Sequence, residues 1–151
     1  MSTLYETDRF RWAREQTSLL RRAASLRLNA PRGLGWEHIA EVIEQLGKDK
    51  LDELNARYVV LIAHLLKWRY QPALRCGSIN EQRYRIARIL HRNPSIRPLR
   101  KSEFAEAYAE ARQRALDETG LPTHLVPDQC PFVLQEVEDP DYWPTAEGDG
   151  A

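Results

Sequence analysis

The sequence predicts an all-α protein, a single-domain bundle of five or six helices with a proline-rich C-terminal tail. Apolar residues recur at the three-and-four spacing of an amphipathic helix in successive segments. Gly, Pro and Asn cluster between these segments, where helices end. No stretch shows the alternation of a half-buried strand. A chain of 151 residues suits one hydrophobic core. We therefore expect one domain over residues 1–144 and a disordered tail over 145–151.

The first two predicted helices flank a turn. Residues 7–26 carry an apolar face at helical spacing, with Thr7 as the expected N-cap. Residues 36–46 follow a turn cluster and end at Gly47, because glycine is favoured just past a helix end. The apolar face of this second helix, which we expect to help build the core, consists of Ile39, Val42, Ile43 and Leu46. The opposite face carries Glu37, Glu41 and Glu44.

The third predicted helix, residues 49–70, is the expected centre of the bundle. Asp49 with Asp52 resembles a capping box at its start, and Pro72 ends it. Its apolar residues follow a seam like that of a coiled coil, namely Leu51, Leu54, Tyr58, Leu61, Leu65 and Trp68. A second stripe beside the seam consists of Val59, Ile62 and Leu66. A helix that is apolar over so much of its circumference is covered on at least two sides.

Two further helices and a short one complete the predicted fold. An S-x-x-E capping box begins a helix over residues 78–93. Ser102 is the expected N-cap of the next helix, which ends before Gly120. In the proline-rich tail a short helix is expected over residues 131–137, and its Phe132 and the later Trp143 would hold the tail against the core.

The net charge of zero hides a strong segregation of charge along the chain. Residues 67–101 contain ten bases against Glu81 alone, whereas residues 102–151 contain two bases against twelve acids. A basic block can bind nucleic acid, and an acidic tail can mimic it. A dedicated nucleic-acid domain usually has a clearly basic overall balance. We therefore favour the alternative in which the two blocks neutralise each other within one fold.

Composition indicates a cytoplasmic protein with no membrane segment. No apolar run approaches the ~20 residues that span a bilayer, and Asp8 and Arg9 stand where a secretory signal would be apolar. Cys76 and Cys130 have neither a CxxC partner nor a histidine at metal-ligand spacing, which indicates reduced thiols. Cys130 precedes the short helix, whose dipole could lower the pKa of the thiol, although such a residue is more often a small buried cap. No motif indicates a cofactor.

Several short motifs give the chain a family resemblance. They are Tyr5-Glu-Thr-Asp8 with Trp12, Trp36-Glu37, Ala40-Glu41, Ile43-Glu44, Leu46-Gly47, His64-Leu-Leu-Lys-Trp68, Tyr70-Gln-Pro72, Glu81-Gln-Arg83, Asn93-Pro-Ser95, Glu118-Thr-Gly-Leu-Pro122 and Cys130-Pro131. With them the sequence resembles the bacterial family catalogued as domain of unknown function number twenty-nine, common in cyanobacteria and proteobacteria. It departs from the family in a shorter loop at residues 75–78 and in Gly35, where Asp is typical. The resemblance implies a small helical fold and no known activity.

One candidate is a metal or acid–base site made of Glu37, Glu41, Glu44 and His64. Helical carboxylates that face a histidine on the next helix bind divalent ions in some helical bundles. The Glu-x-x-His motif of those proteins is absent, and Arg57 and Lys67 would repel a cation from His64. The alternative is a network of ion pairs that ties the second helix to a neighbour.

A second candidate is a nucleic-acid surface formed by the arginine stripe Arg85, Arg88 and Arg92. These side chains could track phosphates, but no helix-turn-helix or other reading motif accompanies them. The alternative is pairing, within the chain or across a dimer, with the acidic stripe Glu103, Glu106, Glu110 and Asp117. Because exposed ion pairs contribute only ~0–1 kcal/mol each, such pairing would set partner choice more than stability.

No nucleophile is recognisable in the sequence, because the four histidines lie near no glycine-rich elbow or activated thiol. We therefore expect no enzyme activity. By elimination the sequence favours a non-catalytic helical interaction module that binds another protein or a second copy of itself. Nucleic-acid binding and metal binding remain the alternatives.

Overall fold

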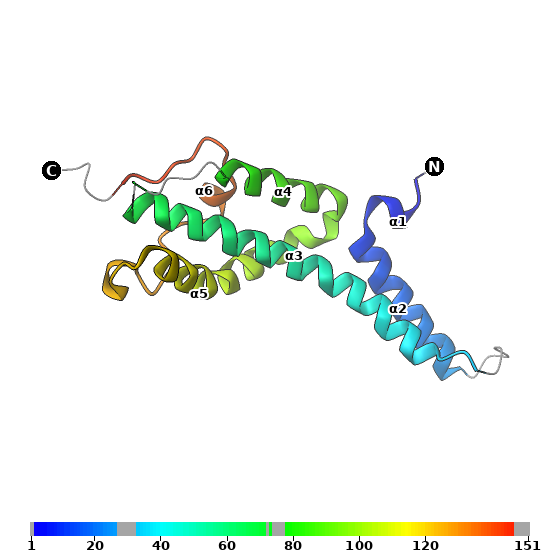
Figure 1. Ribbon diagram of the computed structural model, residues 1–151. Helices are drawn as coiled ribbons and strands as arrows, with labels where there is room; N and C mark the ends of the chain where they lie inside the picture. The colour runs from blue at the N-terminus through cyan, green and yellow to red at the C-terminus, as the bar shows by residue number, and fades with distance from the viewer. Residues whose placement is uncertain (1, 27–32, 72, 74–77, 147–151) are drawn as a thin grey trace. The chain divides into compact units, whose positions relative to one another are not determined.

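The computed structural model describes residues 2–26, 33–71, 73 and 78–146, and over these residues it is all-α, which confirms the predicted class (Figure 1). Its α-helices are α1 (Leu4–Thr7), α2 (Arg9–Ser25), α3 (Trp36–Tyr70), α4 (Ile79–Arg92), α5 (Arg100–Thr119) and α6 (Leu134–Glu138), with short 3₁₀ segments η2 (Pro94–Leu99) and η3 (Thr123–Leu125).

Contacts group the chain into two compact units, and each is described by itself. The first contains Met1–Asp52 and Ile89–Pro98, and the second contains Glu53–Arg88 and Leu99–Ala151. Helices α3 and α4 therefore contribute residues to both. The expectation of one domain over residues 1–144 stays a prediction. Of the tail for which we expected disorder, residues 147–151 lie outside the described residues.

Residues 36–70 form one long helix, so the prediction of two helices separated at Gly47 is wrong. Gly47 is buried inside α3, at the place where α2 packs against it. A Cβ built on Gly47 would lie 3.5 Å from the Cβ of Ala13 and 3.7 Å from the ring of Phe10. Both distances are ordinary van der Waals contacts, so Gly47 lies in the packed interface between the two helices and does not end one of them.

The start of the first unit also differs from the prediction. Thr7 does not cap a helix over residues 7–26, because α1 ends there and α2 starts after Asp8. The Asp8 carboxylate accepts hydrogen bonds from the backbone N–H of Arg11 at 3.0 Å, and from the N–H and hydroxyl of Ser95 at 2.8 Å each. An N-cap carboxylate satisfies backbone donors that a helix start leaves unpaired. Asp8 therefore joins α2 to the η2 segment.

Residues 53–70 of α3 form the core of the second unit, with α4 and α5 on either side (Figure 1). The predicted seam is fully buried at Leu54, Tyr58, Leu61 and Leu65. The Asn55 amide donates to the carbonyl of Glu103 on α5 at 3.1 Å, and Arg57 donates to the Gln82 amide oxygen on α4 at 3.5 Å. This half of α3 is covered on two sides, as its sequence predicts.

The later helices follow the prediction with shifted starts. Helix α5 begins at Arg100, so Ser102 is not its cap. Its predicted end is confirmed, because Gly120 has a φ of 68° and donates its N–H to the Leu116 carbonyl at 2.9 Å. Helix α6 begins after Val133, three residues later than expected. Among the described helices, none is long and apolar enough to span a membrane.

The C-terminal segment is fastened to α4 by Arg83, a role that we did not predict. Its buried guanidinium donates to the carbonyls of Val137 and Tyr142 at 2.8 Å each. Longer hydrogen bonds reach the Asn80 side chain at 3.2 Å and the carbonyls of Pro140 and Glu136 at 3.4 Å each. The expected aromatic contacts are present, since Phe132 is buried and Trp143 packs on Trp68 with ring centroids 4.6 Å apart.

Candidate functional site

The three glutamates proposed as metal ligands all lie on the first half of α3. Glu44 pairs with Arg21 of α2, with a distance of 2.7 Å between Oε2 and Nη2. This hydrogen bond lowers the pKa of Glu44. Glu37 and Glu41 are exposed. The pair with Arg21 is of the kind that the alternative expects for Glu44, and for Glu37 and Glu41 the alternative stays a prediction.

His64 lies on the same helix as the glutamates, because residues 36–70 are continuous. The expectation that it faces them from the next helix is therefore wrong. Its Nε2 lies 2.9 Å from the hydroxyl of Ser78, so this hydroxyl contacts the histidine. Burial and then the charge of Lys67 lower the pKa of His64. Across residues 2–26, 33–71, 73 and 78–146, no group of three or more His, Cys, Asp or Glu side chains could hold a metal ion.

The arginine stripe lies on the exposed side of α4. Arg85, Arg88 and Arg92 are all exposed. The Arg85 guanidinium pairs with Glu81, one turn earlier on the same helix, at 2.7 Å. The acidic stripe lies on α5, where Glu106 and Glu110 are exposed and Glu103 is half-buried. Pairing between the two stripes therefore stays a prediction, and it would have to displace Glu81 from Arg85.

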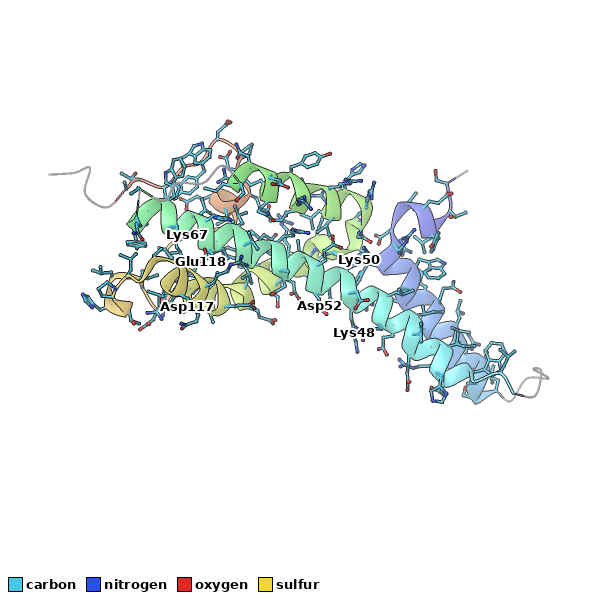
Figure 2. All side chains as sticks on the ribbon, in the orientation of Figure 1. Lys48, Lys50, Asp52, Lys67, Asp117 and Glu118 are labelled. Carbon is cyan, nitrogen blue, oxygen red and sulfur yellow. The ribbon has the colours of Figure 1, made fainter. Side chains whose placement is uncertain are left out.

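A charged cluster that no sequence motif indicates joins α3 to α5. Lys67 is 9% exposed and its ammonium hydrogen-bonds to Glu118 (Figure 2). Arg114 contacts the other oxygen of the Glu118 carboxylate at 2.9 Å. Hydrogen bonds from Lys67 and then Arg114 lower the pKa of Glu118. The cluster accounts for a buried lysine next to His64 by giving it a carboxylate partner.

The Cys130 thiol is free, as predicted, and half-buried. Burial raises its pKa, against a smaller opposing effect of the Phe132 backbone N–H. The alternative of a thiol with a lowered pKa is therefore wrong. Cys76 lies outside the described residues.

The largest departure from expectation is the apolar face of α3, formed by Ile39, Val42, Ile43 and Leu46. We expected this face to help build the core, but Val42 is 64% exposed and Leu46 is 45% exposed. Ile39 and Ile43 are half-buried. On neighbouring α2, Leu19 is 56% exposed as well. The first unit therefore presents large apolar side chains from two packed helices.

This exposure arises because α2 packs against the small side chains of α3 and not against its large apolar ones. Ala40 and Gly47, seven residues apart on one side of α3, are buried, and Gly47 meets Ala13 of α2. Small residues at this spacing let two helices approach closely, so the larger Val42 and Leu46 turn outward. The spacing of Ala40 and Gly47 is compatible with this packing, but it does not by itself place the larger residues on the surface.

The geometry of the described residues defines an all-helical protein, and no cluster of metal-binding side chains is found among them. Comparison with known proteins agrees. The chain belongs to the family "Domain of unknown function DUF29", which it matches over residues 4–143. It is similar to the crystal structure of an alpha-helical protein of unknown function from Rhodospirillum rubrum, with a TM-score of 0.63 and 23% identity over 94% of this chain and 93% of that one. At this identity the likeness shows the fold alone. No curated protein gives a significant match.

Proposed function

We propose that this protein is a non-catalytic interaction module, and that the apolar face of α3 binds another protein or a second copy of the chain. The observation that carries the proposal is the exposure of Val42 and Leu46 on a face whose other members are only half-buried. Contiguous exposed apolar side chains on a helix are typical of interaction surfaces.

Energetics support a partner at this face. Fully burying a Val or Leu side chain is worth about 1.5–3 kcal/mol. Val42 and Leu46 lie one helical turn apart, and Leu19 of α2 adds a third exposed apolar side chain to the unit. A partner that covers such side chains would gain several kcal/mol from the hydrophobic effect. Exposed charges on the same two helices, such as Glu41 on α3 and Arg22 on α2, would then select among partners.

The proposal is tested on the full chain by multi-angle light scattering after size exclusion, together with affinity capture from extracts of its own cells. We expect either a dimer or one protein captured in near-equal amount, with binding lost in Val42→Glu and Leu46→Glu. The matched control is Gln45→Glu, which adds the same charge to an exposed position of α3 outside the apolar face. This control should behave like the wild type.

Three results would count against the proposal. One is a monomer that captures no protein. Another is binding that the Val42→Glu and Leu46→Glu variants leave unchanged. The third is capture that nuclease abolishes and that Arg88→Glu weakens, which would favour the nucleic-acid alternative on α4.

A further inference from the structure

The first unit contains a cleft of about 450 Å³ between α2 and the first half of α3. Clefts of this size bind small organic molecules, for which ~300–1,000 Å³ is typical. The apolar part of its lining comes from Phe10, Leu51 and the backbone at Gly47. None of the exposed apolar residues Leu19, Val42 and Leu46 lines it, so the cleft is distinct from the apolar face of α3.

The polar part of the lining has an excess of positive charge. Three bases and one acid line the cleft: Arg14, Arg21, Lys48 and Glu44. Glu44 is paired with Arg21 at 2.7 Å. Arg14 and Lys48 are exposed and form no hydrogen bond or ion pair among the described residues (Figure 2 labels Lys48 on α3). The guanidinium of Arg14 lies over the Phe10 ring, 5.8 Å from its centre, so a cation without a carboxylate partner among the described residues stands beside the apolar wall.

A buried hydroxyl without a partner also lines this cleft. Thr17 is 5% exposed, and its Oγ1 has no hydrogen-bond partner among the described residues. In a helix a threonine hydroxyl commonly bonds to the carbonyl four residues earlier, and a buried polar group left unpaired is destabilising. Rotation about χ1, for which threonine has two accessible rotamers in a helix, exchanges the hydroxyl with the methyl group. Thr17 can thus offer a hydrogen bond to a polar atom in the cleft.

We propose that the cleft binds a small organic carboxylate with an apolar body, seated on Phe10 and Leu51, with its carboxylate held by Arg14 and Lys48. Charge decides the head group, because the lining carries three cations against the single carboxylate of Glu44, and this excess favours an anion. The apolar part of the lining decides the body, because an inorganic anion would leave the apolar surface that Phe10 and Leu51 present to the cleft uncovered. The Thr17 hydroxyl supplies a further hydrogen bond to an oxygen of the ligand.

The test uses decanoate as the probe, below its micelle concentration, and follows its binding to the full chain by displacement of the fluorescent anion anilinonaphthalene sulfonate. Decylamine has a similar chain with the opposite charge, and acetate has the head group alone. We expect decanoate to displace the dye at one site, and decylamine and acetate to displace little or none at the same concentration.

Variants assign the site. The double variant Arg14→Met, Lys48→Met should raise the Kd for decanoate about tenfold, since it removes both cations that hold the carboxylate. Thr17→Val should raise it about threefold through loss of one hydrogen bond. The control Arg22→Met removes an exposed cation of α2 that does not line the cleft, and should stay within about twofold of the wild type, in keeping with the small effect of an exposed charge. Circular dichroism establishes that each variant is folded.

The proposal is overturned if decanoate does not bind, if decylamine binds as well, or if the double variant binds like the wild type. Its failure is separate from that of the interaction module, because Val42→Glu changes the apolar face of α3 and should bind decanoate with unchanged affinity.

Discussion

Replacing the buried Arg83 should destabilise the protein more than replacing the exposed arginines of the same helix, α4. Arg83 is 5% exposed, and its two shortest hydrogen bonds, both 2.8 Å, reach the carbonyls of Val137 and Tyr142. Hydrogen bonds to charged groups contribute about 1.5–3 kcal/mol each. Arg83→Met keeps most of the apolar stem and removes the donors. Since the freed segment can regain water, we take the lower end and expect a loss of about 3 kcal/mol in the free energy of unfolding.

The assay has a global and a local part. Urea unfolding gives the change in stability, and hydrogen exchange of the backbone amides shows where the chain loosens. We expect faster exchange over residues 134–146, because Arg83 holds this segment. Arg83→Lys should lose most of the same stability, since one ammonium cannot donate along the several directions of the planar guanidinium.

Arg85→Met is the matched control, two positions along the same helix. Arg85 is exposed, and its pair with Glu81 is an i, i+4 contact of the kind worth about 0.3–0.5 kcal/mol. The reasoning is refuted if Arg83→Met is no more destabilising than Arg85→Met. It is also refuted if exchange over residues 134–146 is unchanged in Arg83→Met.

Two further predictions concern α3. Gly47→Ala should stabilise the protein by about 0.5–1 kcal/mol, because alanine is the better helix former and the new Cβ makes ordinary contacts with Ala13 and Phe10. A lower midpoint of urea unfolding in Gly47→Ala than in the wild type would contradict this prediction. Burial lowers the pKa of His64 in the folded protein below the ordinary value of 6.5. Between the lowered pKa and 6.5 the unfolded chain therefore binds more protons than the folded protein. Over this range of pH the free energy of unfolding rises as the pH rises. Urea unfolding measured at several pH values in this range should show that rise in stability in the wild type. The control His91→Gln, which replaces an exposed histidine, should show the same rise, and His64→Gln should show a smaller one.

Local sequence patterns placed the elements that depend on local interactions. The buried seam at Leu54, Tyr58, Leu61 and Leu65 follows from the spacing of apolar residues along the helix. This spacing does not depend on which elements pack against the helix. Gly120 ends α5 because a left-handed residue is needed there, and glycine takes this conformation without strain. In these cases the physical cause lies within a few residues of the feature.

Predictions failed where one residue type has two uses. Gly47 suits a helix end and also suits close helix packing, and only the presence of Ala13 and Phe10 beside it selects the second use. Thr7 and Asp8 are both good N-caps, and the donors of Ser95 from far along the chain favour Asp8. For the candidate site, the expected placement of His64 failed with the helix break, because it depended on that break.

By itself the sequence determined that the protein is helical, where α4 and α5 lie, and which residues fill the second unit, because helix periodicity, capping and burial of a seam are local in origin. The tertiary structure alone decided which face of α3 meets α2, which carbonyls Arg83 binds, and which cations meet in the cleft beside Thr17. Those outcomes depend on side chains brought together from distant parts of the chain. A helix that can bury either its large residues or its small ones has no local signal that chooses between them.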